Sequence, residues 1–395
     1  MTMPRALHAL AISTFAIGTT EFVIVGLIPG MAADLHVSLT TAGLLVSMYA
    51  LAITIGGPLG TALTGHFDRR WLIIALMGVF LLGNLAGAWA PNFEMLLAAR
   101  VVTAVAHGVF FSVGAAVAST LVPRNKSSQA VAVMMGGLTI AMVLGVPLGS
   151  WLGEQLSWRA PFLVVAGLAL VALVSLLAFL PASIAHTPPE SLIAQARLLG
   201  NPRLVTMYLV TAIGWGATFV TFTYISPLLT EVTGISASAV NVALVVFGVA
   251  TVAGNITGGR LADRLGTKPT LTFVLIGTSI VLAALPFTAH SAVAMFINIA
   301  VWGFFAFAIN PVMQAGVVQI AEDEFPDAVG TASGFNIAAF NLGISGGSLL
   351  GGLIVQSSGV ISTPWGGVVM AVVALGIATV VLKRRSHVKT SLIGV

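Results

Sequence analysis

Apolar runs long enough to cross a membrane follow one another along almost the whole chain, with only short polar breaks between them. A helix needs about 20 residues to cross the roughly 30 Å of hydrocarbon in a bilayer. Backbone polar groups cannot stay unpaired in lipid, so such runs must form helices, and the alternating strands of a transmembrane barrel are not found in the sequence. The predicted spans are 7–29, 41–63, 71–90, 94–120, 129–153, 160–181, 204–228, 237–258, 269–288, 291–318, 329–352 and 365–382.

The composition leads to the same fold class. Hydrophobic residues make up 58% of the 395 residues, charged residues only 7%, and the mean hydropathy is +1.06. A soluble domain carries about 25% charged residues because its surface must face water. The 43 glycines suit a protein in which small residues let membrane helices approach closely. We therefore predict an all-α integral membrane protein with twelve transmembrane helices.

Several classes of function are excluded by what the sequence lacks. It has no cysteine, so disulfides, thiol catalysis and cysteine-based metal sites are excluded. The sequence also lacks the G-x-x-x-x-G-K-[ST] loop of ATP-driven pumps and the motifs of membrane hydrolases. The pI of 9.9 reflects scattered basic residues, which do not form a nucleic-acid-binding patch. We expect no enzyme activity, no metal and no cofactor, whereas a receptor that transports nothing stays an alternative.

The distribution of Lys and Arg predicts that both termini are cytoplasmic. Of the 16 basic residues, all except Arg100 and Arg159 fall in the two termini or in every second connection between spans. The positive-inside rule places these segments in the cytoplasm. The first span contains Glu21 and lacks a cleavage site, so we interpret it as a retained helix. The acidic run 322–327 is expected to be a solvated cytoplasmic loop.

The chain divides into two similar halves. The longest internal polar stretch lies between the sixth and seventh spans. Features of the first half also recur about 198 residues later: Pro227 corresponds to Pro29, and Lys268 corresponds to Arg70. Parallel six-helix halves imply a substrate site between them near the midplane of the bilayer. The predicted domains are an N-terminal bundle (1–181), a cytoplasmic linker (182–203) and a C-terminal bundle (204–395).

Four motifs resemble those of the major facilitator transporters, and the resemblance covers the whole chain. The segment 258–268 is similar to the family's signature loop between the second and third helices of each half, and 61–70 is a degenerate copy with Asp68 in place of a glycine. The segment 141–149 resembles the motif of export-direction antiporters. Trp158-Arg159 and residues 19–29 resemble the twelve-span drug:proton antiporter branch, nearest to the arabinose and sugar efflux permeases, which have purine and nucleoside exporters among their relatives.

The resemblance implies a monomeric, proton-coupled exporter in a bacterial inner membrane, built from two pseudo-symmetric six-helix bundles. Spans 1, 4, 7 and 10 would line a central cavity. The signature loops would form a latch that closes the cytoplasmic side, and the antiporter motif would give a kinked, close-packed helix between the halves. The alternative for the signature loops is that they are merely solvated, and the alternative for the antiporter motif is simple helix packing. The latch residues are Asp68, Arg69, Arg70, Arg260, Asp263 and Arg264, and those of the antiporter motif are Gly145, Pro147 and Gly149.

Charged residues inside the spans need a reason, because each costs about 2.5–3.5 kcal/mol on insertion scales. Glu21 and Arg100 lie in the outer parts of the first and fourth spans, and His107 lies on the same face of its helix as Arg100. Glu21 and Arg100 form either a static ion pair or a switch in which moving Arg100 changes the proton affinity of Glu21. His107 either relays protons or is a neutral side chain bonded to substrate or to a neighbouring helix.

The predicted substrate cavity is lined by aromatic, hydroxyl and amide side chains on the fourth, seventh and tenth spans. Such side chains suit a flat or amphipathic solute of low charge, although packing explains any single one of them. We expect export of drug-like compounds; sugars or purine nucleosides, and uncoupled facilitation, stay as alternatives. The expected partners are the lipid bilayer, protons and a small organic substrate. The candidates are Thr103, Trp215, Thr218, Phe219, Phe222, Asn298, Trp302 and Asn310.

Overall fold

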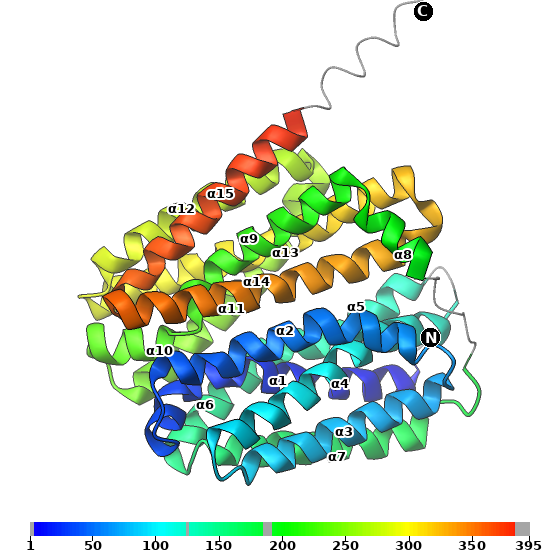
Figure 1. Ribbon diagram of the computed structural model, residues 1–395, viewed down its shortest axis with the longest axis horizontal. Coiled ribbons are helices and arrows are strands. Elements are labelled where there is room, and N and C mark those ends of the chain that lie inside the picture. The colour runs from blue at the N-terminus through cyan, green and yellow to red at the C-terminus, as the bar shows by residue number, and fades with distance from the viewer. Residues whose placement is uncertain (1–3, 124–125, 185–191, 384–395) are drawn as a thin grey trace, which may run out of the picture. The chain divides into compact units, whose positions relative to one another are not determined.

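The computed structural model describes residues 4–123, 126–184 and 192–383, and its regular structure in these ranges is helical throughout (Figure 1). Twelve helices are long and apolar enough to cross a membrane. The prediction of an all-α protein with twelve spans is therefore confirmed. Four of the basic residues that support the predicted topology lie outside the described ranges: Arg124, Arg384, Arg385 and Lys389. Residues 185–191 of the predicted linker also lie outside them.

The first six spans are continuous helices except for the fifth. Side chains cap several of them: Ser38, Asp68 and Asn92 accept hydrogen bonds from backbone N–H groups of the first turns that follow them. The elements are α1 (Arg5–Asp34), α2 (Leu39–Leu63), α3 (Arg69–Ala88), α4 (Phe93–Thr120), α5 (Ser127–Ile140), the π-helical turn η2 (Ala141–Gly145), α6 (Val146–Gln155) and α7 (Arg159–Phe179).

The remaining elements repeat this order. Helices α11, α12 and α13 begin about 198 residues after α2, α3 and α4, in agreement with the offset read from the sequence. The elements are α8 (Leu192–Leu199), α9 (Pro202–Phe222), α10 (Ile225–Pro227), η3 (Leu228–Val232), α11 (Ala237–Leu265), α12 (Thr267–Thr288), α13 (Ala292–Glu324), η4 (Pro326–Ala328), α14 (Val329–Ser358), η5 (Val360–Ser362) and α15 (Thr363–Lys383).

Two helices run further than the sequence predicted. Helix α11 continues through the expected signature loop and ends before Gly266, whose φ of 86° suits the left-handed backbone at a helix end. Helix α13 includes the acidic run up to Glu324, so the prediction of a loop there is wrong. Asn201 and Arg203 at the start of α9 both bind the Glu324 carboxylate, which explains why the last turn of α13 is retained.

The described residues form two compact units. The first contains the chain up to residue 184 together with Thr223–Gly248, and the second contains residues 192–222 and 249–383. The domain boundaries 1–181, 182–203 and 204–395 stay a prediction.

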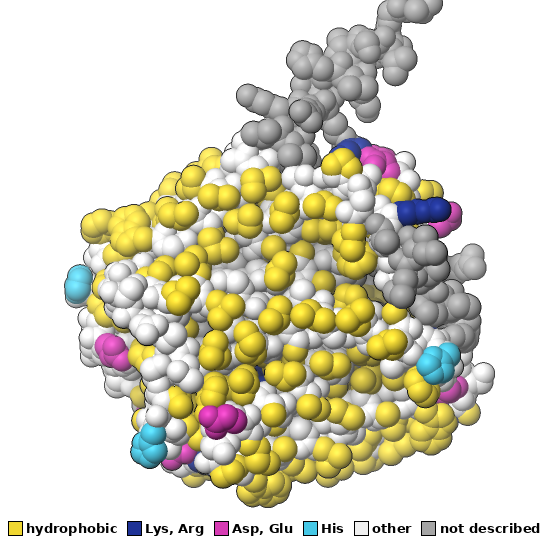
Figure 2. All heavy atoms as spheres, viewed as in Figure 1, with side chains coloured by type: hydrophobic (Ala, Val, Ile, Leu, Met, Phe, Trp, Pro, Cys, Tyr) yellow, Lys and Arg dark blue, Asp and Glu magenta, His cyan; other side chains and the backbone are white. Residues whose placement is uncertain are grey.

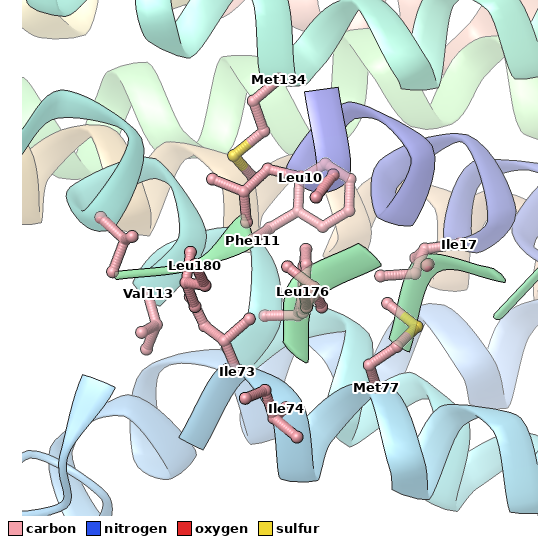
Figure 3. Packing of buried hydrophobic residues seen from close by; sticks show 14 of the residues in the cluster. Leu10, Ile17, Ile73, Ile74, Met77, Phe111, Val113, Met134, Leu176 and Leu180 are labelled. Carbon is pink, nitrogen blue, oxygen red and sulfur yellow. The ribbon is translucent and has the colours of Figure 1, made fainter. Parts of the chain in front are cut away.

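The core of the first unit is a cluster of aliphatic, methionine and phenylalanine side chains from α1, α3, α4, α5 and α7 (Figure 3). Leu10 and Ile17 of α1 lie among Met77 of α3 and Leu176 of α7 in this cluster, and all four are fully buried. Outside, hydrophobic side chains cover most of the face shown in Figure 2, and charged side chains lie mainly near its edges. This distribution suits helices whose outer surfaces contact lipid.

Candidate functional site

Arg100 is the central residue of a buried polar cluster in the first unit. It lies on α4 and is only 1% exposed. Its Nε donates a hydrogen bond to the Leu45 carbonyl of α2 at 3.0 Å, and its Nη1 donates to the Thr20 carbonyl of α1 at 3.1 Å. Its guanidinium carbon also lies 4.2 Å from the centre of the Tyr49 ring, within range of a cation–π interaction. One side chain therefore ties three helices together.

Glu21 lies next to this cluster without an ion pair to Arg100. Its neighbour Thr20 supplies the carbonyl that Arg100 binds, and the charges of Glu21 and Arg100 interact through space. Within the described ranges, however, the ion pairs are Arg159–Asp34 and Arg203–Glu324. The Arg100 Nη2 atom is buried and has no hydrogen-bond partner there. Backbone carbonyls thus hold the guanidinium in place, and the half-buried Glu21 side chain is not needed for that.

His107 lies two turns further along α4 and is linked to Arg100 through Tyr49. The Tyr49 hydroxyl and the His107 Nδ1 atom are 3.2 Å apart, and both residues are buried. The His107 ring also contacts Phe111, with 4.7 Å between ring centres. The structure thus links Arg100 and His107, which lie on one face of α4, through Tyr49, a residue that the sequence analysis did not single out.

Two further polar residues of the cluster were also missed. Thr20 donates a hydrogen bond to the Asn84 Oδ1 atom of α3 at 2.9 Å, and the Asn84 amide donates to the Phe80 carbonyl at 2.8 Å. Asn84 interrupts an apolar span and is 1% exposed, so its polarity was the signal that could have identified it. Tyr49 offered a weaker signal, because a tyrosine in an apolar span is often a packing residue.

Thr103, a predicted cavity residue, is bonded within its own helix. Its hydroxyl donates to the Arg100 carbonyl at 2.9 Å, and it is 2% exposed. A Cβ atom on Gly83 of α3 would lie only 2.4 Å from the Thr103 methyl group. Thr103 thus fills the contact between α3 and α4 beside the cluster.

The antiporter motif packs against the helix that carries Glu21. A Cβ atom on Gly145 would lie 2.2 Å from the Thr19 hydroxyl, and one on Gly149 would lie 2.4 Å from a Val23 methyl group. The two glycines are therefore the close-contact face of η2 and α6 toward α1. Pro147 stands in the first turn of α6, immediately after the π-helical turn, where its missing N–H causes the least disruption.

The predicted latch residues of the first half lie at the start of α3. The Asp68 side chain caps this helix by accepting from the Trp71 backbone N–H at 3.0 Å. Arg69 is buried, and Arg70 donates to the Leu177 carbonyl of α7 at 3.1 Å. These residues thus have local structural roles in the first unit.

The corresponding residues of the second half differ in their surroundings. Arg260, Asp263 and Arg264 lie in the last turns of α11, and all three are exposed. These three residues therefore form an exposed row of charges at a helix end.

In the second unit, Trp215 of α9 lies in an aromatic cluster with the predicted Phe219 and with two rings that the sequence analysis missed, Phe307 and Phe340. Its ring contacts Phe307 of α13 and Phe340 of α14 edge to face, with 4.9 Å and 5.3 Å between ring centres, and Phe219 at 5.6 Å. The Trp215 indole N–H is buried and has no acceptor in the part of the chain that the structure describes. A buried N–H donor beside edge-to-face aromatic rings suits a ligand that supplies a hydrogen-bond acceptor.

The other predicted cavity residues extend this cluster to different degrees. Phe222 and Trp302 contact each other edge to face at 6.1 Å, and Thr218 is buried on the same helix as Trp215. Asn298 donates from its amide to the Val281 carbonyl of α12 at 3.2 Å, and its own Oδ1 is unpartnered within the described chain. Asn310 is half-buried.

A buried hydrogen-bonded chain in the same unit was not predicted. Thr211 of α9 donates to the Asn336 Oδ1 atom at 2.8 Å, and the Asn336 amide donates to the Gln314 Oε1 atom at 2.8 Å. This chain connects α9, α14 and α13, and Asn336 is completely buried. The described residues contain no group of acidic or histidine side chains suited to a metal ion.

Comparison with known proteins identifies the family. The profile of the Major Facilitator Superfamily matches residues 10–315 and 204–394. The chain belongs to this superfamily. Its helices also superpose on a crystal structure of a D-xylose–proton symporter with a TM-score of 0.77, over 95% of this chain and 96% of that one, at 18% identity. This likeness shows the shared fold.

Three relatives of this superfamily member show the kinds of transporter that it resembles. It is 40% identical to the inner membrane transport protein YdhP of Escherichia coli K12 over 93% of its length and 94% of that protein. It is 34% identical to a chloramphenicol resistance protein of Streptomyces lividans over 95% of its own length and 96% of that protein. It is 31% identical to a probable sugar efflux transporter of Mannheimia succiniciproducens, with 93% and 91% covered. The chain is thus a multi-pass membrane transporter with efflux-type relatives, and it is not an enzyme.

Proposed function

We propose that this transporter exports small, drug-like organic solutes in exchange for protons, by alternating access across a bacterial inner membrane. The names of its relatives, a chloramphenicol resistance protein among them, support the outward direction and the substrate class. The relative in Escherichia coli, an inner membrane transport protein, supports the inner membrane location. Both termini are cytoplasmic and the working unit is a monomer in this proposal.

Glu21 is the proton-carrying group in this proposal. The observation that carries it is that Arg100 binds backbone carbonyls of α1 and α2 and forms no ion pair with Glu21 within the described chain. A static ion pair would keep Glu21 ionised, whereas a carboxyl near a fixed guanidinium can gain and lose its proton as its hydration changes. Arg100 then supplies a fixed positive charge that favours release of the proton.

The antiporter motif supports this role by fixing α1. Gly145 and Gly149 let α1 approach η2 and α6 at Thr19 and Val23, which flank Glu21 in the sequence. The packing of η2 and α6 against α1 therefore sets the surroundings of Glu21. In this proposal Arg260, Asp263 and Arg264, which are exposed, act as latch residues on the cytoplasmic side, and Asp68, Arg69 and Arg70 add this role to their local contacts at the start of α3.

The test is the flux of a substrate panel in proteoliposomes under an imposed proton gradient. The panel contains chloramphenicol, a lipophilic cation, a pentose and a purine nucleoside. We expect gradient-driven flux of chloramphenicol by the wild type and none by Glu21→Gln. Glu94→Gln is the matched control, because Glu94 is an exposed carboxylate in the first turn of α4. Gradient-driven flux that survives Glu21→Gln contradicts the role of Glu21, and flux of no compound contradicts the proposed substrate class.

A second candidate substrate class is sugars. The probable sugar efflux relative favours it, as does the buried set of aromatic, hydroxyl and amide side chains around Trp215. The same panel separates the two classes, since only a sugar exporter moves the pentose under the gradient. Drug export ranks first because the chain is more similar to the chloramphenicol resistance protein, at 34% identity, than to the probable sugar efflux transporter, at 31%.

A further inference from the structure

Tyr49 connects two buried functional side chains through two different parts of its own structure. Its ring face lies 4.2 Å from the Arg100 guanidinium carbon, and its hydroxyl lies 3.2 Å from His107 Nδ1. Arg100 and Tyr49 are 1% exposed and His107 is 5% exposed. The three side chains come from only two helices, α2 and α4. Their contacts are therefore set locally within the first unit.

The direction of the hydrogen bond between Tyr49 and His107 follows from the charge beside it. A phenol hydroxyl can donate to Nδ1 or accept from it. The Arg100 cation above the ring draws electron density from the phenol, which strengthens its O–H as a donor. Donation by Tyr49 requires that Nδ1 carries no proton.

The surroundings of His107 also favour an uncharged ring. The side chains that face it are Tyr49 from α2 and Phe111 from its own helix, and the charged group whose field reaches it is Arg100. No carboxylate among the described residues is bonded to it. A second positive charge in this buried site would repel Arg100.

We infer that Tyr49 is a positioning residue that holds His107 as a neutral imidazole with its proton on Nε2, and that His107 donates this proton as a hydrogen bond to an oxygen of the transported solute. Within the described chain, Nδ1 is the one ring nitrogen of His107 that has a hydrogen bond, so Nε2–H is available. The solute would carry a hydroxyl or carbonyl oxygen. The second half of this inference rests on the proposed transport function.

The tautomer can be measured without any substrate. The full-length protein, labelled with ¹⁵N in its histidine rings, is studied by NMR in lipid nanodiscs, and the His107 signals are assigned by their loss in His107→Asn. We expect an unprotonated Nδ1 and a protonated Nε2 at neutral pH. In Tyr49→Phe, which keeps the ring against Arg100, we expect the two tautomers to mix. A proton on Nδ1, or an imidazolium, in the wild type would overturn the inference.

Transport kinetics test the donor role separately. A Gln amide can reach the Nε2 position of a histidine, whereas an Asn amide reaches only the Nδ1 position. We expect His107→Gln to keep KM near the wild-type value, and His107→Asn to raise KM roughly threefold to tenfold, the loss of one hydrogen bond. Both should keep proton dependence, and His8→Gln, at an exposed site, is the control.

The outcomes distinguish this inference from the proposed function. Loss of proton dependence in both His107 variants would make His107 a proton carrier and overturn the donor role. Equal KM values for His107→Gln and His107→Asn would overturn it as well. Absence of flux in the wild type would contradict the proposed function, while the tautomer measurement would still decide the role of Tyr49.

Discussion

The polar cluster of the first unit has a sequence counterpart in the second half that contains no ionisable group. Glu21 and three residues of the cluster are each replaced about 198 residues later by a phenylalanine or an amide: Glu21 by Phe219, Tyr49 by Phe247, Arg100 by Asn298 and His107 by Phe305. The helices that carry them begin 197 to 199 residues apart, so these are equivalent positions in the two halves.

Asn298 retains part of what Arg100 does. Each lies near the start of the fourth helix of its half and donates to the backbone carbonyl of another helix, Arg100 to Leu45 and Thr20, and Asn298 to Val281. The shared part of the design is therefore a helix-to-helix hydrogen bond, which needs no charge. What the first half adds is a fixed cation, and a carboxylate near it. The comparison teaches that the two halves share a scaffold but not its side chains: at these positions the first half has titratable groups, and the second has three phenylalanines and an amide.

The largest effect should come from exchanging equivalent positions in transport assays. Glu21→Gln should reduce gradient-driven flux to that of empty liposomes, since an amide exchanges no proton. Phe219→Leu, at the equivalent position of α9, should change KM but keep the dependence on the gradient. Measuring flux against the imposed gradient checks both. Loss of gradient dependence in Phe219→Leu would break the division of roles between the halves.

Removing the two helix-to-helix donors should destabilise the halves unequally. Arg100→Ala removes two hydrogen bonds to carbonyls of other helices and leaves a buried space, and we expect a loss of about 3 kcal/mol. Asn298→Ala removes one hydrogen bond, and we expect about 1 kcal/mol. The apparent Tm in one detergent checks the order. Equal shifts would show that the charge of Arg100 contributes nothing beyond its hydrogen bonds.

Two glycine contacts, one in each half, should differ in how far they tolerate an added methyl group. A Cβ atom on Gly347 of α14 would lie 2.3 Å from the Gly216 carbonyl oxygen of α9, which is backbone and cannot turn aside. On Gly149 it would meet a methyl group of Val23, which can rotate. We expect Gly347→Ala to cost about 2 kcal/mol and Gly149→Ala about 1 kcal/mol.

Neighbouring glycines provide the controls for this comparison. A Cβ atom on Gly346 or Gly136 would meet nothing within 4 Å. Alanine at either should leave the apparent Tm unchanged or raise it slightly, because alanine favours a helix. A large loss at Gly149 together with none at Gly347 would reverse the expected order.

The smallest effects should come from the two exposed ion pairs. Asp34 accepts from Trp158 at 2.8 Å and from Arg159, and Glu324 accepts from Asn201 and Arg203. Partly exposed pairs contribute little, so Asp34→Asn and Glu324→Gln should each lower the unfolding free energy by less than about 1 kcal/mol. Thermal unfolding at low and high salt checks this. A loss of several kcal/mol at either site would show that it anchors its unit.

Most of the fold was predictable because lipid leaves few choices. Twelve apolar runs had to become helices, and all twelve appear. The ends of helices were less predictable: α11 extends through a charged motif up to Gly266, and α13 extends to Glu324 because residues of α9 bind that carboxylate. A sequence shows that a segment is polar but not whether a distant residue satisfies it.

The charged and polar residues of the candidate site could be predicted from the sequence, but the contacts that connect them could not. Glu21, Arg100 and His107 were conspicuous because charge and polarity are costly in a membrane helix. Tyr49 was inconspicuous, since its role comes from lying between Arg100 and His107.

The sequence by itself determined the fold class, the repeat of two halves and the scarcity of buried charge, because hydropathy and charge are properties of single residues. Only the tertiary structure decided that Arg100 binds the Thr20 and Leu45 carbonyls without an ion pair to Glu21 within the described chain, and that Gly145 and Gly149 press against α1. The physical reason is that a hydrogen bond or a close contact depends on the positions of two groups far apart in the chain. Those positions exist only once the helices have packed.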